Sequence, residues 1–286
     1  MLALGFGLTA ALTWAVHDLL ARKVSQGAAL LPILALVLGA GCVVLVPLAL
    51  AVGDWGAMTG PAWGFAALSG LAIVVGMGSL YKAFSIAPVR LVAPVVGAYP
   101  MLSLGFAMLQ GQPVTGFEWL SVLAICAGIA IVALSSGSDS AEGYAAPAAT
   151  ALAWAALSAV GFALTFALGQ EAARLGAELP VVLTARVVAL VVVVTLLLWH
   201  RGGLVAQRSN LPMLAVMGVF DAAALGLVTA AGGLPRAEYA SVASSLFGVL
   251  TVLLAAWFLN ERVRPVQWLG IAAVFSGIAV LGLQGA

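Results

Sequence analysis

The end of the chain repeats a segment that lies 149 positions earlier, and this repeat constrains the fold more than any other feature. The last two apolar runs, Tyr239–Leu283, contain WFLNERVRPVQWLGIAAVFSGIAVLGL, and the earlier segment reads AMLQGQPVTGFEWLSVLAICAGIAIVAL. Trp119 aligns with Trp268, and about eight of the 21 positions in Val114–Leu134 are identical to their counterparts. A chain of 286 residues with this period is expected to consist of two duplicated halves.

The composition places both halves in a membrane. The chain is 64% hydrophobic and 7% charged, whereas soluble domains carry roughly 25% charged residues. The net charge of +1 gives no reason to expect a nucleic-acid partner. We expect Cys42 and Cys126 to be small buried residues rather than a disulfide or metal ligands. The first run is not typical of a cleavable signal peptide, because it lacks a basic lead and contains His17 and Asp18.

Ten apolar runs are long enough to cross a bilayer, which takes about 20 residues. The predicted helices are about Leu2–Ala21, Ala29–Val52, Pro61–Phe84, Val89–Leu109, Val114–Leu134, Ala146–Leu168, Leu179–Trp199, Leu211–Ala231, Glu238–Leu259 and Pro265–Leu283. The polar stretch Ser135–Tyr144 divides them five and five. We therefore expect a first repeat at residues 1–134, a linker at 135–145 and a second repeat at 146–286.

Five is an odd number, so the second half must enter the membrane upside down relative to the first. The sequence thus predicts an all-α integral membrane protein, with ten transmembrane helices arranged as two five-helix inverted repeats around a central cavity. This arrangement recurs in secondary transporters, because two equivalent packings of the halves open the centre to opposite sides.

The loop charges favour one orientation. One face carries seven cations and the other carries only Arg174 and Arg236. The seven are Arg22, Lys23, Arg90, Arg201, Arg208, Arg262 and Arg264. The positive-inside rule would put their face in the cytoplasm and both termini outside.

The end of each half carries a short polar loop followed by a Trp and a Gly-Ile pair. This pattern resembles the ten-helix EamA-type branch of the drug/metabolite transporter superfamily. The second-half loop, Asn260-Glu261-Arg262, follows the family pattern, whereas the first-half loop reads Gly111-Gln112-Pro113 and lacks the acidic residue. The opening helix, with LTWAVHDLLARK, is also similar to that of the family.

Among the branches, the chain most resembles bacterial exporters of amino acids, such as the aromatic amino-acid exporters. This resemblance implies export of small metabolites across the inner membrane, with amino acids as the first candidate substrates. It also implies that both termini lie in the cytoplasm, against the cation count.

The first helix carries a polar stripe. Thr9, Thr13 and His17 recur at every fourth position and share one face, with Trp14 and Asp18 beside it. Lipid offers no hydrogen-bond partner, so the stripe must face protein or a water-filled cavity. We interpret it as a wall of the substrate cavity; interhelical hydrogen bonding is the alternative. His17 also suits proton coupling, since histidine titrates near neutral pH.

The sixth helix occupies the equivalent place in the second half. It carries a stripe of aromatic and hydroxyl side chains: Trp154, Ser158, Phe162, Thr165 and Phe166. We predict that Trp154, Ser158 and Phe162 line the cavity, with ordinary aromatic packing as the alternative.

Further candidates lie on helices 3, 4 and 9. Tyr81 and Lys82 end the third helix, where Lys82 either extends to the interface or pairs with Asp18 or a substrate carboxylate. Tyr99 and Ser103 flank Pro100, which invites a kink in the fourth helix. Ser244 lies in the corresponding stretch of the ninth, where small residues also allow close packing.

Two more ionisable groups lie deep in apolar runs, Arg186 in the seventh helix and Asp221 in the eighth. Such groups are costly in a bilayer and are functional candidates by default. We expect either a structural ion pair between these antiparallel neighbours or direct work on substrate or protons, with Asp18 as a further coupling candidate.

No catalytic motif accompanies these residues. The chain has two histidines, His17 and His200, without HExxH, GxSxG or a Gly-rich phosphate loop. We therefore expect neither enzyme, cofactor nor metal site, but a monomeric secondary transporter for a small molecule. A sugar, a nucleobase or a drug-like compound remains an alternative substrate, and a channel an alternative class.

Overall fold

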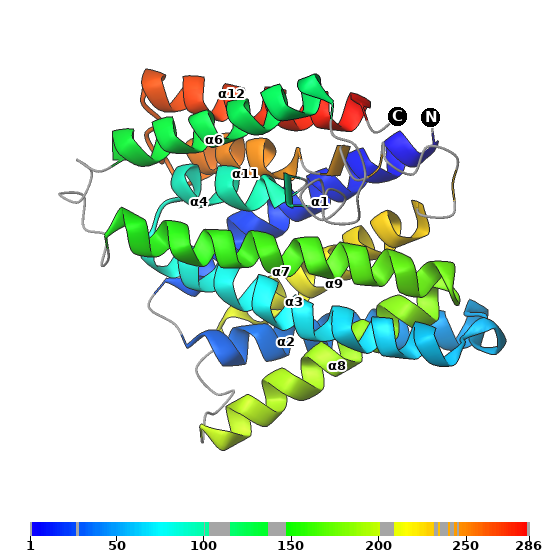
Figure 1. Ribbon diagram of the computed structural model, residues 1–286. Helices are drawn as coiled ribbons and strands as arrows, with labels where there is room; N and C mark the ends of the chain where they lie inside the picture. Colours follow the sequence, from blue (N-terminus) through cyan, green and yellow to red (C-terminus); the bar gives the residue numbers. More distant parts are fainter. Residues whose placement is uncertain are drawn as a thin grey trace.

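A computed structural model describes residues 2–26, 29–99, 101–102, 115–136, 147–200, 209–231, 234, 240, 243–244 and 246–284. Within these residues the protein is helical and has no strand (Figure 1). Its α-helices are α1 (Leu2–Ser25), α2 (Leu30–Val52), α3 (Gly60–Ile86), α4 (Val89–Gly97), α6 (Gly116–Ser136), α7 (Ala148–Arg174), α8 (Glu178–Trp199), α9 (Leu211–Ala230), α11 (Phe247–Phe258) and α12 (Pro265–Gln284). A short 3₁₀ turn, η1 (Trp55–Ala57), joins α2 to α3.

The two halves of the helix bundle are related by a pseudo-two-fold axis that lies across the helices. Each helix of the second half runs opposite to its counterpart, as α7 does to α1 and α12 to α6 (Figure 1). Contacts between the halves also come in matched pairs: α3 packs on α7 as α9 packs on α1, α3 on α8 as α9 on α2, and α1 on α11 as α7 on α4. The helices α2, α4 and α6 each touch their own counterparts α8, α11 and α12. The predicted inverted repeat is therefore confirmed.

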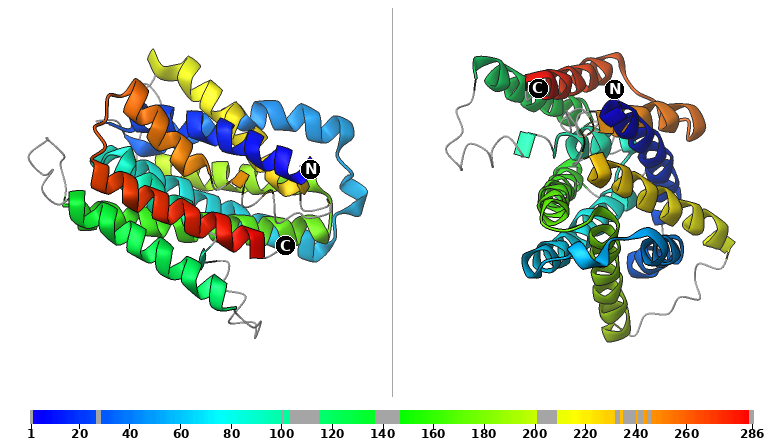
Figure 2. Two further views of the ribbon diagram at one scale, coloured as in Figure 1. Left: turned by 90° about the horizontal axis from the view of Figure 1, so that it is seen from above. Right: turned by 90° about the vertical axis from the view of Figure 1, so that its right-hand side faces the viewer.

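The outer surface of this bundle is apolar. Val43 is 75% exposed, Leu123 62% and Leu198 70%, and water would not solvate a belt of such side chains. Among the described residues, α2, α3, α7, α8 and α9 are long and apolar enough to cross a membrane, and α6, α11 and α12 carry shorter apolar stretches. The chain is a multi-pass membrane protein, and the α6–α12 pair lies at one edge of it with α8 at the opposite edge (Figure 2).

One expectation about burial was wrong. Cys42 is buried on α2, but Cys126 is exposed on α6. A position that faces lipid selects apolar residues just as a buried position does, so an apolar run cannot tell the two apart.

Two of the predicted helices, Val89–Leu109 and Glu238–Leu259, are not continuous. The helix α4 ends at Gly97 and is followed by a turn at Ala98, and α11 begins only at Phe247, after a turn. Gly97 is a weak helix former, and the Pro at position 100 has no N–H with which to continue the hydrogen bonds of α4. The two turns fall at equivalent places in the 149-residue repeat, so the interruption belongs to both halves.

Close contact between α3 and α7 depends on glycine. A Cβ atom at Gly161 would collide with the backbone of Gly76. The Ser158 hydroxyl donates to the Gly76 carbonyl at 2.9 Å, and the Ser69 hydroxyl donates to the Thr165 carbonyl at 2.9 Å. Small residues thus let the two helices approach closely, and a serine side chain of each helix donates to a backbone carbonyl of the other. In lipid, where the hydrophobic effect does not drive helix association, such packing and hydrogen bonds hold helices together.

This packing predicts that Gly161→Ala destabilises the protein by about 1–3 kcal/mol, because the added methyl group must push the α3 backbone away. The matched control is Gly64→Ala on α3, where a Cβ meets nothing within 4 Å. That change should be neutral or stabilising by up to about 1 kcal/mol, through helix propensity. Thermal unfolding of the purified variants in detergent checks both; equal midpoints would contradict the close approach.

Candidate functional site

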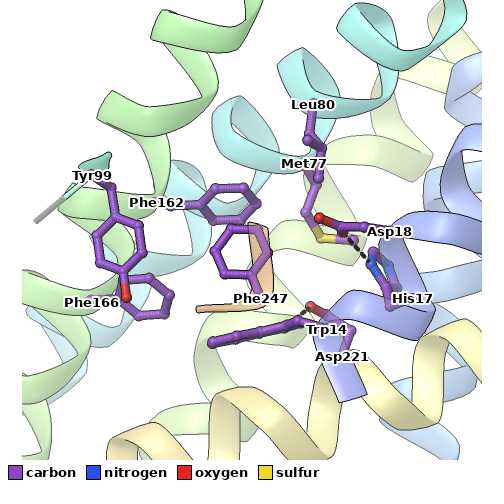
Figure 3. Close-up of a pocket in the computed structure, with 10 residues that line it drawn as sticks. All are labelled: Trp14, His17, Asp18, Met77, Leu80, Tyr99, Phe162, Phe166, Asp221 and Phe247. Carbon is purple, nitrogen blue, oxygen red and sulfur yellow. Dashed lines mark hydrogen bonds and ion pairs between the residues drawn. The ribbon is translucent and has the colours of Figure 1, made fainter. Parts of the chain in front are cut away.

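A cavity lies at the centre of the bundle, where three pairs of equivalent helices meet: α1 with α7, α3 with α9, and α4 with α11. Its closed room is about 20 Å³, enough for about one water molecule, and the empty space between its walls is about 360 Å³ when open solvent is counted in. Figure 3 shows the lining side chains, which are Trp14, His17, Asp18, Met77, Leu80, Tyr99, Phe162, Phe166, Asp221 and Phe247.

One polar wall is built on Asp221 of α9. Its carboxylate accepts a hydrogen bond from the Trp14 indole N–H at 3.2 Å and an ion-pairing hydrogen bond from the Arg186 guanidinium of α8. Arg186 is fully buried, and a Cβ at Gly41 of α2 would collide with its guanidinium. The pair therefore ties α1, α8 and α9 together and needs a glycine on α2 to make room for it.

A second polar group lies beside it on α1. The two imidazole nitrogens of His17 each have an oxygen partner: Nδ1 is 3.0 Å from Asp18 Oδ1, and Nε2 is 2.9 Å from the Tyr81 hydroxyl of α3. His17 and Asp18 are 2% and 3% exposed. The second carboxylate oxygen, Asp18 Oδ2, has no hydrogen-bond partner in the described part of the chain. A buried carboxylate with one unsatisfied oxygen at a cavity wall is ready to accept from a ligand.

The opposite wall is aromatic. The ring centroids of Tyr99 and Phe166 are 5.0 Å apart, those of Trp14 and Phe166 5.6 Å, and those of Trp14 and Phe247 6.1 Å. The Tyr99 hydroxyl is 3.1 Å from the Ser244 hydroxyl, a hydrogen bond that joins the end of α4 to the stretch before α11. In Figure 3 the aromatic side chains Tyr99, Phe162 and Phe166 lie on one side, and His17, Asp18 and Asp221 lie on the other.

The two walls are counterparts in the repeat, and they have diverged. Position 17 is a histidine, and 149 residues later position 166 is a phenylalanine; Asp18 corresponds in the same way to Ala167. A symmetric backbone therefore encloses a chemically asymmetric cavity, polar at the α1–α9 side and aromatic at the α7 side.

The predicted site residues fall into three groups. In the lining are Trp14, His17, Asp18, Tyr99, Phe162 and Asp221. Directly behind it, in contact with lining residues, are Tyr81, Arg186 and Ser244. Outside it are Thr13, Lys82, Trp154 and Ser158. Ser103 lies outside the described residues.

Local contacts account for the residues outside the lining. The Thr13 hydroxyl donates to the Ala10 carbonyl of its own helix at 2.9 Å, and Ser158 is used in the α3–α7 contact. Trp154 packs half-buried against the core. Lys82 is half-buried and makes no ion pair within the described part of the chain.

Four lining residues were not among the predicted cavity residues: Met77, Leu80, Phe166 and Phe247. Phe166 belongs to the aromatic stripe and Met77 and Leu80 to the turns before Tyr81, so helical spacing carried a signal for them. Phe247 is the repeat counterpart of Ala98, which precedes Tyr99. Among the described residues no three His, Cys, Asp or Glu side chains come close enough together to hold a metal ion.

An ion pair closes one end of the bundle. Arg22, near the end of α1, donates through Nε to Glu261 at 3.2 Å and through Nη1 to the Phe84 carbonyl of α3. Glu261 also accepts from the Val89 N–H at the start of α4, at 2.9 Å. The Arg22 and Glu261 side chains are only 5% and 7% exposed. One carboxylate in the α11–α12 loop, next to Asn260 with its positive φ of 52°, thus joins the second half to α1 and α4, and through Arg22 to α3. We call Arg22, Phe84, Val89 and Glu261 the end clamp.

Two inverted five-helix repeats, with broken helices around an amphipathic central cavity, are typical of secondary transporters. The chain belongs to the EamA-like transporter family, whose model matches residues 1–134 and again residues 149–283. A crystal structure whose title reads "Crystal structure of protein" is similar to it, with a TM-score of 0.68 and 20% identity over 99% of this chain and 96% of that one. At that identity the likeness concerns the fold alone. A comparison with curated proteins found no match.

The ion pair at the cavity predicts a stability effect. Asp221→Asn leaves the buried Arg186 charge uncompensated and should lower the free energy of unfolding by about 3–5 kcal/mol. Replacing both partners, as Asp221→Leu with Arg186→Met, should recover much of that loss, because no charge then remains buried. Thermal midpoints in detergent test this, with Asp54→Asn, an exposed carboxylate on the α2–α3 connection, as the matched control. A double variant less stable than Asp221→Asn would contradict the interpretation.

The end clamp predicts an accessibility effect. Glu261→Gln keeps an acceptor for the Val89 N–H but removes the charge that holds Arg22, which should favour opening of this end by about 1–2 kcal/mol, or roughly 5- to 30-fold. A cysteine at Ser85, in a background with Cys42 and Cys126 replaced by serine, should then react faster with a water-soluble maleimide. Glu171→Gln breaks an exposed pair with Arg174 and serves as the control. Equal labelling rates in Glu261→Gln and the parent would show that the ion pair does not hold this end shut.

Proposed function

We propose that this protein exports small metabolites that carry an amino group, amino acids in the first place and with broad specificity, across the bacterial inner membrane. It works as a monomer by alternating access. One observation carries the proposal: the cavity is amphipathic, with two carboxylates at one side and aromatic rings at the other. A substrate that fits has a cationic head and an apolar body.

The polar wall suits an ammonium group. Asp18 Oδ2 has no partner in the described part of the chain, and Asp221 shares the same cavity. Hydrogen bonds between a charged donor and a carboxylate are about twice as strong as neutral ones. Aromatic faces such as Trp14 add attraction for a cation, while Phe162 and Phe166 pack against an apolar side chain.

The α-carboxylate of an amino acid needs a donor as well. Arg186 contacts the lining through Asp221, and its Nε and Nη1 groups have no partner in the described part of the chain. Arg186 is fully buried behind Asp221, so it would have to turn toward the cavity, once a substrate ammonium shares Asp221, to donate to the carboxylate. Recognition of a zwitterion thus uses both members of the existing ion pair.

A second candidate substrate class follows from the same wall. Among the described lining residues there is no lysine or arginine. This favours organic amines that lack a carboxylate, such as arylalkylamines, over acidic metabolites. The two classes share the ammonium and the apolar body, and they differ only in the need for Arg186.

Counterflow into proteoliposomes with three matched compounds tests the proposal: phenylalanine, phenethylamine without the carboxylate, and 3-phenylpropionate without the ammonium. Glucose and uracil represent the other solute classes. We expect saturable uptake of phenylalanine or phenethylamine, stimulated by the same compound inside, and no uptake of phenylpropionate. Asp18→Asn removes one charge-assisted hydrogen bond and should weaken half-saturation roughly 10- to 100-fold, as expected for about 1.5–3 kcal/mol.

Asp54→Asn, with its exposed side chain far from the cavity lining, should transport like the parent. Uptake of glucose or uracil without any uptake of the amino compounds would overturn the substrate class. Flux that rises linearly with concentration, with no stimulation by internal substrate, would indicate a channel instead of a carrier.

A further inference from the structure

We propose that His17 and Asp18 form a proton-binding site, and that its proton and the substrate ammonium exclude one another, so that one proton enters for each molecule exported. This inference rests on the proposed function and adds its driving force. It starts from four ionisable side chains buried at or behind the cavity wall: His17, Asp18, Arg186 and Asp221.

The charges of these four groups do not balance without a bound proton. Asp221 is neutralised by Arg186. Asp18 is neutralised when the His17–Asp18 pair holds one more proton, either on the second imidazole nitrogen or on the carboxylate itself. Without that proton, one negative charge stays buried without a partner, which is costly in a low-dielectric interior. Either a proton on His17 or a cation in the cavity removes that cost.

No other described group that faces the His17–Asp18 pair supplies a positive charge to it. The groups that face the pair are the Tyr81 hydroxyl from α3, Asp221 from α9 and Tyr99 from the end of α4. The thiol of Cys42 on α2 is buried. Other cations nearby in the sequence are Arg22, which binds Glu261, and Lys82, which lies outside the lining.

The geometry gives the proton and the ammonium separate positions on the same carboxylate. Asp18 Oδ1 faces His17 Nδ1 at 3.0 Å, and Asp18 Oδ2 has no partner in the described part of the chain. An ammonium can therefore bind Oδ2 without displacing the imidazole. What the two ligands share is the single negative charge, so competition between them is electrostatic and not steric.

Proton release preserves the hydrogen bonds of the imidazole. In the doubly protonated imidazole, Nε2–H donates to the Tyr81 oxygen 2.9 Å away, and Nδ1–H donates to Asp18. When R–NH₃⁺ binds at Asp18, His17, which lines the cavity, loses its Nε2 proton to the cavity, and the Tyr81 hydroxyl reverses to donate to Nε2. The ammonium that enters adds one positive charge and the proton that leaves removes one, so the net charge of the site stays the same. Every hydrogen bond of the imidazole is kept.

The repeat sets the stoichiometry at one proton. The counterparts of His17 and Asp18 in the second half are Phe166 and Ala167, which do not titrate. A simple amine then exchanges electroneutrally, one cation out for one proton in. An amino acid carries no net charge, so its exchange moves one positive charge inward and responds to membrane potential.

The first test measures protons directly. Purified protein in weakly buffered detergent with a pH-indicator dye should release close to one proton per phenethylamine or phenylalanine bound. His17→Gln should still bind, with release reduced at least tenfold, because the glutamine amide does not titrate. Asp54→Asn should release protons like the parent.

The second test uses proteoliposomes. Vesicles acidic inside, with the membrane potential held at zero, should accumulate phenylalanine about tenfold per unit of pH difference, as one-for-one exchange requires, whereas protein-free vesicles should not, because the zwitterion is not trapped by a pH difference. His17→Gln should equilibrate the substrate without accumulating it. A potential, negative inside, should slow phenylalanine uptake and leave phenethylamine uptake unchanged.

The outcomes separate the two proposals. Binding and counterflow without proton release, and without any response to the pH difference, would overturn proton exchange and leave the amino-compound transporter standing. Absence of both binding and counterflow for the amino compounds would overturn both. The measurements on the parent protein decide the question even where His17→Gln fails to fold.

Discussion

Lipid offers no hydrogen-bond partner, and this constraint accounts for where the polar side chains lie. The carboxylate of Asp221 takes hydrogen bonds from two other helices, and His17 uses both ring nitrogens. Even the hydroxyl groups return to backbone carbonyls, as Thr13 does on α1. Because each such partner has to come from the protein, the polar groups join helices that the hydrophobic effect cannot hold together in a bilayer. The cavity lies where this pairing is incomplete, as at Asp18 Oδ2, which has no hydrogen-bond partner in the described part of the chain.

The duplication of the five-helix unit explains the symmetric backbone, and the sequence differences between the two halves explain the asymmetric side chains of the cavity. Matched contacts between the halves offer the bundle two equivalent ways to pack, which is the basis of the alternating access that we propose. The side chains break that equivalence. Glu261 clamps one end, whereas its counterpart at position 112 is a glutamine, and His17 corresponds to Phe166. A carrier whose two packings differ in buried charge has unequal populations of its two states, so the sequence differences between the halves bias a symmetric mechanism.

Much of this architecture was predictable from the sequence. Apolar run length gave the helices, and an odd number of crossings per half required the inversion. The break after Gly97 was predictable in part, since Pro100 invites a kink in the fourth run, whereas the break before Phe247 was not, since the run Glu238–Leu259 contains no proline to mark it. The hydroxyl groups on the predicted polar stripes were weak indicators of the cavity, because the hydroxyls of Ser158 and Thr13 donate to backbone carbonyls instead. A serine or threonine in an apolar helix has that local option, whereas His17, Asp18 and Asp221 do not, and these ionisable residues all reached the cavity.

The end clamp and the cavity wall share two helices. Arg22 follows Asp18 by four residues on α1, so the two side chains lie on one face a single turn apart. On α3 the Phe84 carbonyl that accepts from Arg22 lies one turn beyond Tyr81, which binds His17. A movement that separates α1 from α3 therefore strains the contacts of His17 and of Arg22 together. We therefore expect charge at Asp18 and closure of this end to be coupled through a single helical turn, a coupling that a double-mutant comparison of Asp18 and Arg22 would measure.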